Sequence, residues 1–253
     1  MMNLNITDAV KHLIIINIIF FIGTYIIGTE VAYNFLALHF PENPDFKIWQ
    51  PVTHMFMHGN FMHLFFNMFA LFSFGVVLEQ MWGSKKFLFF YFSCGLGAAA
   101  LHIGINYITF HNGLEVLMAN GTTKDAILQV LSEGKYDTDW QQLMTPDQFQ
   151  NFIQTYLTPM LGASGAIYGV LVAFAFMLPN AELMLMFIPV PVKAKYFVPG
   201  LLALDLFLGL KGSSIFGSGG DGVAHFAHIG GAIIGFIMMW YWKKAQFNNN
   251  RWN

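Results

Sequence analysis

The sequence predicts an all-α polytopic membrane protein with six transmembrane helices, and two observations lead to that prediction. Of its 253 residues, 56% are hydrophobic and only 10% are charged, whereas soluble domains carry about 25% charged residues. Apolar segments with few charges, of roughly the 20 residues needed to cross a bilayer, recur along the chain. No internal repeat or second domain is apparent, so we expect residues 1–253 to form a single membrane domain.

Six apolar segments define the predicted helices. They cover residues 11–29, 58–80, 86–108, 163–179, 196–211 and 225–242. With the N-terminus in the cytoplasm, eight Lys and Arg residues fall on inside segments and four on outside loops. The positive-inside rule therefore favours both termini in the cytoplasm. We expect an integral multi-pass protein of the cell (inner) membrane.

An extended outside loop is predicted at residues 110–160. The segment Thr145-Pro146-Asp147-Gln148 has the pattern of a capping box with proline at the first helical position. Apolar residues follow at helical spacing: Phe149, Phe152, Ile153, Tyr156 and Leu157. This pattern predicts an amphipathic helix on the membrane or on the bundle. A weaker pattern at Ile127, Leu128 and Leu131 indicates a second one.

Charge and cysteine content exclude several classes of function. The net charge of −2 leaves no basic surface for nucleic acid. The single cysteine, Cys94, rules out an intramolecular disulfide and a cysteine-rich metal site. The expected partner of so apolar a surface is membrane lipid.

Polar groups that open the membrane helices are the candidates for chemistry, because each is costly inside a bilayer. Ser164 lies in Gly162-Ala163-Ser164-Gly165 at the start of the fourth helix, and His225 and His228 open the sixth. The second, fourth and sixth helices all begin on the outside, so their starts share one face. We therefore predict Ser164 as a nucleophile and His228 as its base.

Small residues would let these helices approach closely. Gly165 and Gly169 form one small-residue face and Gly231 and Gly235 another. Contact between the two faces would bring Ser164 within hydrogen-bond reach of His228. Tyr168, one turn below Ser164, is placed to pack against the imidazole.

Further polar side chains of the second helix complete the predicted site. His63 and Asn67 share one helix face at i and i+4, and both can donate hydrogen bonds to an oxyanion. The backbone N–H of Ser164, at a helix N-terminus, is a third donor. His54 and His58 are expected to support the site and hold water.

Asp205, in the fifth helix, is predicted to make a structural hydrogen bond. Its position near mid-membrane, on a helix that runs the other way, argues against a third catalytic member. We expect no metal and no organic cofactor.

Other interpretations remain open on the residues alone. Serine and glycine at a helix contact are most often packing devices, and a membrane histidine is often structural. A zinc protease would need a HExxH motif, which is absent. A non-catalytic chaperone or adaptor that binds transmembrane helices is the alternative from another class, whereas a transporter would usually show an internal repeat.

Taken together, the motifs resemble those of the rhomboid family of intramembrane serine proteases. GASG followed by Tyr168 resembles the family's GxSG motif, and HLFFN at residues 63–67 resembles its HxxxN motif. Ala227-His228 with Gly231 and Gly235 resembles its catalytic histidine and the glycine-rich helix that carries it. The resemblance implies a rhomboid-like six-helix bundle with a Ser164–His228 dyad and no acidic member. It also implies an oxyanion site formed by Ser164, His63 and Asn67.

The resemblance implies three structural features around the site. Residues 30–53 would form a partly embedded first loop, in which Trp49-Gln50 stands where the family often has Trp-Arg. The fifth helix would act as a lateral gate for the expected partners, transmembrane proteins as substrates. Gly212–Gly222 would be a cap over the site, and we expect Ile215 or Phe216 in it to plug the site until substrate arrives.

Overall fold

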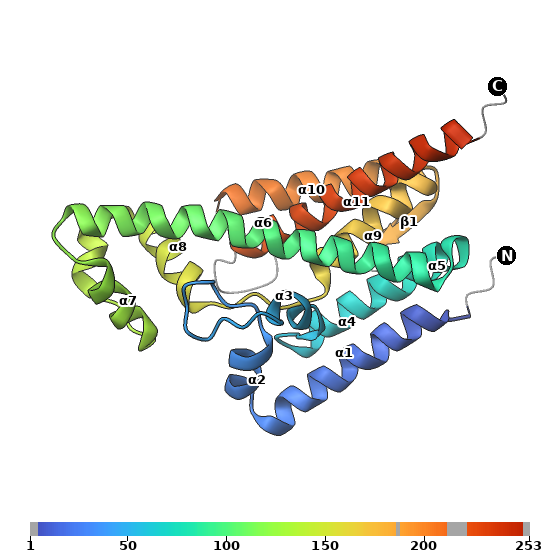
Figure 1. Ribbon diagram of the computed structural model, residues 1–253. Coiled ribbons are helices and arrows are strands. Elements are labelled where there is room, and N and C mark those ends of the chain that lie inside the picture. Colours follow the sequence, from blue (N-terminus) through green and yellow to red (C-terminus); the bar gives the residue numbers. More distant parts are fainter. Residues whose placement is uncertain (1–4, 186–187, 212–221, 250–253) are drawn as a thin grey trace.

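A computed structural model describes residues 5–185, 188–211 and 222–249, and most of these residues are helical (Figure 1). Within these described ranges, three helical segments are long and apolar enough to cross a membrane: Asp8–Ile27, Phe61–Trp82 and Ser84–Ala119. The shorter apolar helix Ser164–Met177 and two C-terminal helices complete the bundle.

The N-terminal half contains α1 (Asp8–Ile27), α2 (Thr29–Leu36), α3 (Gln50–Thr53), η1 (His54–Phe56), α4 (Phe61–Ala70), η2 (Leu71–Gly75), α5 (Val76–Trp82) and α6 (Ser84–Ala119). The C-terminal half contains α7 (Lys124–Ser132), η3 (Thr138–Gln142), α8 (Pro146–Leu157), α9 (Ser164–Met177), β1 (Glu182–Leu185), β2 (Ile188–Lys193), α10 (Ala194–Lys211) and α11 (Gly222–Asn249). The second predicted span is therefore one continuous helix, α4–η2–α5, with a π-helical turn in its middle.

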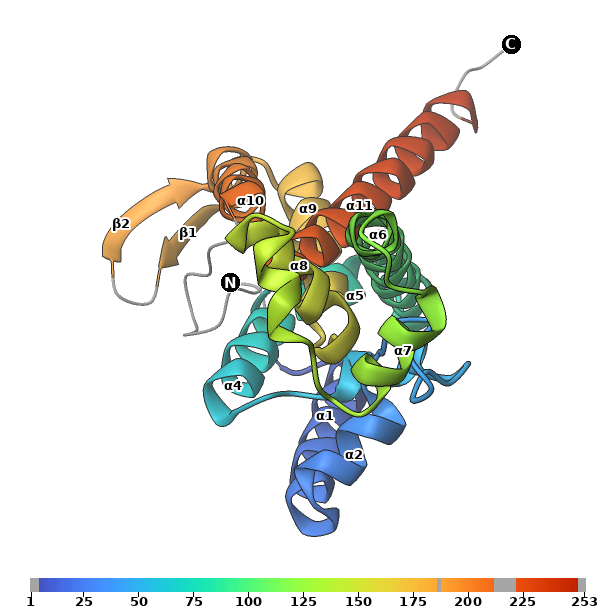
Figure 2. The ribbon, with the colours of Figure 1, turned by 90° about the vertical axis from the view of Figure 1, so that its left-hand side faces the viewer.

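Helix α9 lies at the centre of the bundle. It contacts α6, α10 and α11 as well as the α4–η2–α5 segment, and most of its residues are buried. Helices α4, α9 and α11 start toward one end of the molecule and run in the same direction, whereas α6 and α10 run the other way (Figures 1 and 2). The parallel arrangement predicted from the sequence thus places three helix starts together.

Glycine pairs set the distance between α9 and α11. A β-carbon added to Gly231 would overlap the carbonyl group of Gly165, and one added to Gly235 would lie 2.8 Å from the Gly169 α-carbon. These are backbone-to-backbone approaches that no side chain would permit. The predicted contact between the two glycine faces is confirmed.

Helix α6 is longer than the predicted third span. Residues 110–119, expected to belong to an outside loop, continue the helix to Ala119. Its 36 residues correspond to about 54 Å at 1.5 Å per residue, well beyond a hydrocarbon core of about 30 Å. The reason is a local apolar face, because Phe110, Leu114 and Leu117 recur at helical spacing and are all buried.

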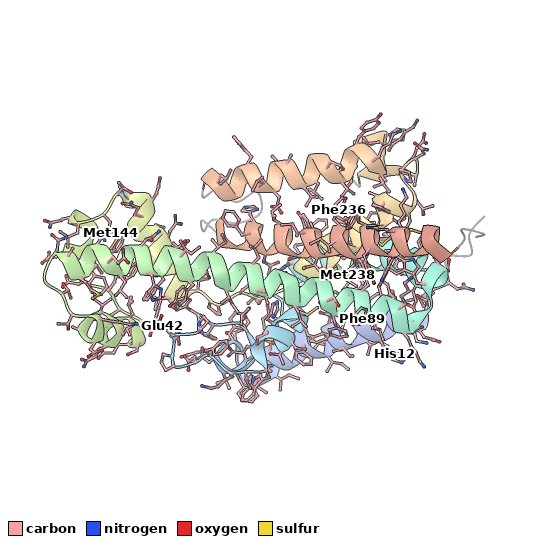
Figure 3. The ribbon with its side chains drawn as sticks, turned by 45° about the horizontal axis from the view of Figure 1, so that its top comes forward. His12, Glu42, Phe89, Met144, Phe236 and Met238 are labelled. Atoms are coloured by element: carbon pink, nitrogen blue, oxygen red, sulfur yellow. The ribbon has the colours of Figure 1, made fainter. Side chains whose placement is uncertain are left out.

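The end of α6 carries a small second core, which we call the extension (residues 109–157). Phe152 of α8 stacks on Phe110, with ring centroids 4.9 Å apart, and its ring lies against Gly113. Ile127 and Leu131 of α7 join the same cluster. The capping box at Thr145 and Gln148 is confirmed. In Figure 3 Met144, within the extension, lies at the opposite end of α6 from Phe89.

A two-stranded antiparallel hairpin, β1–β2, precedes α10. The all-α prediction missed this hairpin. The sequence of β2, Ile188-Pro189-Val190-Pro191-Val192-Lys193, alternates proline with β-branched residues. Proline removes a helical hydrogen bond and β-branched side chains favour extended backbone, so this segment does not continue a helix.

Candidate active site

Ser164 and His228 meet where α9 and α11 begin. The Ser164 Oγ lies 2.7 Å from the His228 Nε2. Ser164 is the first residue of α9, so its backbone N–H is one of the four at a helix start without an intrahelical partner. A hydroxyl in this contact can pass its proton to the imidazole.

The imidazole of His228 is held on its face by Tyr168. The two rings are stacked, with centroids 4.2 Å apart and planes inclined by 7°. Tyr168 lies one turn after Ser164 on α9, and the structure places it where the sequence predicted. The stack fixes the plane in which His228 presents its nitrogens to neighbouring groups.

The chain that leads to Ser164 is anchored at two places by three backbone hydrogen bonds. Met160 and Leu38 exchange two backbone hydrogen bonds of 2.8 Å, and the Gly162 N–H donates to the His54 carbonyl at 2.9 Å. Gly162 has φ +126°, and a β-carbon there would lie 2.9 Å from the His63 ring. Both observations require glycine at this position, so the GxSG pattern has a steric cause.

Asp205 is the largest departure from the sequence-based expectation. Its Oδ2 lies 2.7 Å from the His228 Nδ1, and its Oδ1 contacts the Nδ1 of His225. The prediction that Asp205 lies at a different depth from His228 is wrong. Asp205 is six residues before the end of α10 at Lys211, and His228 is six residues after the start of α11 at Gly222. Counted from the connection between the helices, the two residues are level.

His63 lies beside the serine and Asn67 one turn further along α4. The His63 ring contacts Gly162, and His58 packs edge-on against His63 with ring centroids 5.0 Å apart. Asn67 is buried and its amide donates to the His63 carbonyl at 2.8 Å. An Asn amide has two N–H donors, so this contact leaves one for a ligand.

A small cavity opens next to the serine. It has a volume of about 20 Å³ and is lined by polar and small residues that include His54, Gly162, Ser164, Gly165 and His228. This volume is enough for one water molecule. His54 therefore borders the site as predicted, whereas His63 and Asn67 do not line this cavity.

The first loop is anchored by Gln50, the residue that stands where the family often has arginine. Gln50 is fully buried. Its Oε1 accepts from the backbone N–H of His39 and of Lys47, and its Nε2 donates to the carbonyls of Asn34 and Asp45. Four hydrogen bonds from one neutral side chain thus hold the loop without a charge. Residues 30–53 also include the short helices α2 and α3, which were not predicted.

Two further observations concern the predicted plug and a possible metal site. The predicted plug residues Ile215 and Phe216 lie outside the residues that the structure describes. Asp205, His225 and His228 offer ligand atoms within 4.8 Å of one another, a spacing that a metal ion could bridge. The Nδ1 atoms of both histidines already contact the Asp205 carboxylate.

Together, the fold and this site define a class: helical membrane proteins in which a serine contacts a histidine at the start of packed helices. Comparison with known sequences gives the family. The rhomboid domain family matches residues 45–120 and 141–245. The chain therefore belongs to the rhomboid family and is an integral membrane protein.

Individual relatives are distant and longer. The chain is 27% identical over 190 residues to mitochondrial rhomboid protein 1 of Saccharomyces cerevisiae, covering 75% of this chain and 40% of that protein. It is 29% identical over 203 residues to the rhomboid protease AarA of Providencia stuartii, covering 75% and 54%. It is 31% identical over 71 residues to the rhomboid protease GlpG of Salmonella typhi, covering 28% and 26%. The matched part of the chain thus spans about half the length, 40% to 54%, of the first curated relatives.

Proposed function

We propose that this protein is an intramembrane serine endopeptidase that cleaves transmembrane segments of membrane-protein substrates. The observation that carries the proposal is the 2.7 Å contact between Ser164 Oγ and His228 Nε2 in a bundle of rhomboid sequence. Relatives named as rhomboid proteases support the same activity.

In the proposed mechanism Ser164 attacks the carbonyl carbon of a substrate peptide bond. The proton of its hydroxyl moves to His228 Nε2 as the Oγ–carbon bond forms. The Ser164 backbone N–H, His63 and Asn67 donate to the oxyanion. His228 then gives the proton to the leaving amine, and the C–N bond breaks. Water taken up in the cavity next to Ser164 hydrolyses the acyl-enzyme through the same base.

The substrate must reach a serine that lies among membrane helices. We propose that it enters beside α10, the fifth helix, and unwinds near a small residue to expose a carbonyl. The chain would cross the membrane six times with both termini in the cytoplasm, because eight of its 12 Lys and Arg residues then fall inside. Reporter fusions to the N-terminus, to the extension and to the C-terminus test this topology. A cytoplasmic extension would contradict it.

The decisive experiment combines cleavage with active-site labelling. Purified protein in proteoliposomes is offered a panel of single-span substrates, and a fluorophosphonate probe reports a nucleophilic serine. Ser164→Ala and His228→Ala should abolish cleavage and labelling while the variants remain folded. Ser73→Ala is the matched control, because the Ser73 hydroxyl only donates to the Phe69 carbonyl of its own helix at 2.7 Å. Near-normal turnover by Ser164→Ala would reject the mechanism and favour a non-catalytic helix-binding protein.

A further inference from the structure

The contact between Asp205 and His228 has no place in a two-residue mechanism. Asp205 is 5% exposed and lies in an apolar helix, where an unpaired carboxylate would be costly. Two histidines compensate for this cost. His228 Nδ1 lies 2.7 Å from Oδ2, and His225 Nδ1 contacts Oδ1.

Ser164, His228 and Asp205 form a continuous chain of contacts. His228 has its Nε2 at Ser164 Oγ and its Nδ1 at Asp205 Oδ2, both at 2.7 Å. From the rhomboid resemblance alone we expected no acidic member. We propose that Asp205 is a positioning residue that fixes the tautomer and orientation of His228, so that the proposed protease works with a Ser164–His228–Asp205 triad.

The carboxylate decides which nitrogen of His228 carries the proton. An ionised carboxylate can only accept a hydrogen bond, so the hydrogen between Asp205 and His228 must be on Nδ1. The neutral ring then has its lone pair on Nε2, which faces the Ser164 hydroxyl and can take its proton. Without the carboxylate the ring could carry its hydrogen on Nε2 and would be unable to act as the base.

Asp205 also stabilises the His228 ring when that ring is protonated. When His228 takes the proton from Ser164 it becomes an imidazolium, and the negative charge on Asp205 is in contact with it. Asp205 remains ionised throughout, so the proton moves only between Ser164 Oγ, His228 Nε2 and the leaving amine. His225 holds the second carboxylate oxygen and lies on the same face of α11 as His228, three residues earlier.

This inference rests on the proposed protease activity, and the variants separate the two. If Ser164→Ala and His228→Ala retain cleavage, the protease mechanism fails whatever Asp205 does. If both are inactive and Asp205→Asn cleaves normally, only the role of Asp205 fails.

The kinetic test compares Asp205→Asn with two variants. Asp205→Asn should lower kcat and the rate of fluorophosphonate labelling about 10²- to 10⁴-fold with KM unchanged. Asp205→Glu, which keeps the charge, should recover part of the loss. The control is Glu79→Gln, which alters another buried carboxylate (4% exposed) that accepts from the N–H groups of Ala9 and Val10. Glu79→Gln should lower Tm but leave kcat unchanged.

A merely structural Asp205 gives a different pattern. Asp205→Asn would then resemble Glu79→Gln, with a lower Tm and kcat within about threefold of the unaltered enzyme. The rate of fluorophosphonate labelling would then also stay within about threefold of that of the unaltered enzyme. This result would overturn the proposal.

A measurement on the unaltered protein covers the case in which Asp205→Asn does not fold. The ¹⁵N resonances of His228, assigned by their absence in His228→Ala, report which ring nitrogen bears hydrogen. We expect a protonated Nδ1 and an unprotonated Nε2. A neutral ring with its hydrogen on Nε2 would overturn the proposal.

Discussion

Gly231 of α11 faces the carbonyl group of Gly165 on α9 so closely that a β-carbon at Gly231 would overlap it. Gly165 lies one position after Ser164, and Gly231 lies three positions after His228. The backbone contact therefore controls the separation of the proposed nucleophile and base.

Gly231→Ala should push α9 and α11 apart. We expect a loss of stability of about 1–3 kcal/mol from overpacking. Turnover should fall about 10²-fold, because a displacement of about 1 Å is enough to misalign reacting groups. Thermal unfolding and cleavage kinetics in detergent measure the two effects. Gly104→Ala in α6 is the control, since a β-carbon there has nothing within 4 Å. Equal behaviour of the two variants would show that the glycine contact does not align the site.

His63→Ala and Asn67→Ala should each lower kcat while Ser164 remains reactive in the folded protein. Removal of one oxyanion donor costs about 10²–10³ in rate. Asn106→Ala is a matched control, because Asn106 and His102 form a similar buried i, i+4 pair on α6, 3.0 Å apart. If neither variant at His63 or Asn67 lowers kcat below that of Asn106→Ala, these residues do not bind the oxyanion.

The sequence alone predicted the features that depend on where a helix starts and on the spacing of residues along it. Ser164 and His228 could be paired because each opens an apolar segment on the same predicted face. The contact of Gly165 with Gly231 followed from the same alignment. Asp205 was misplaced because its depth was judged from the middle of its helix. The two residues are level because α11 begins at Gly222, three residues before the predicted start of the sixth helix.

Other features depend on pairings that no local pattern encodes. The continuation of α6 past residue 108 is stabilised by Phe152, which lies more than 30 residues further along the chain. The four hydrogen bonds of Gln50 involve partners between Asn34 and Lys47 whose positions follow from the folded loop. Apolar periodicity predicts which face of a helix is buried. It does not predict which distant group will form a hydrogen bond with a buried side-chain amide.

Gln50→Ala should destabilise the first loop. The substitution leaves two backbone N–H groups and two carbonyls without their partner, and at about 0.5–1.5 kcal/mol per hydrogen bond we expect a loss of at least about 2 kcal/mol. Trp49→Phe is the comparison, since it removes one hydrogen bond, from Trp49 Nε1 to the Phe35 carbonyl, and keeps an aromatic ring next to Phe35. Thermal unfolding in detergent should rank Gln50→Ala as clearly less stable. The reverse order would mean that the loop is not held by Gln50.

Chelation should not reduce activity. In the proposed mechanism both nitrogens of His228 are engaged, one with Ser164 and one with Asp205, so the base needs no metal. Cleavage should proceed at the same rate after incubation with EDTA and dialysis. Loss of activity that returns on addition of Zn²⁺ would instead assign Asp205, His225 and His228 as metal ligands.

Phe152 of α8 connects the extension to α6. Phe152 is fully buried, stacked on Phe110 and seated against Gly113. Phe152→Ala removes the contacts of this ring with Phe110 and Gly113 of α6, and truncation of a buried aromatic residue costs about 3–5 kcal/mol. We expect the extension to open locally, with faster hydrogen exchange and proteolysis in α7 and α8.

Cleavage of substrate should nevertheless continue in Phe152→Ala. Helix α8 ends at Leu157, seven residues before Ser164, but the intervening segment has anchors of its own. Met160 is paired with Leu38, and Gly162 donates to the His54 carbonyl. Loosening of α8 should therefore stop before it reaches the serine. Leu143→Ala, which truncates a side chain 38% exposed, should leave both exchange and cleavage unchanged. A fall in kcat in Phe152→Ala, without displacement of the other helices, would show that the extension positions Ser164 and that the two anchors are insufficient.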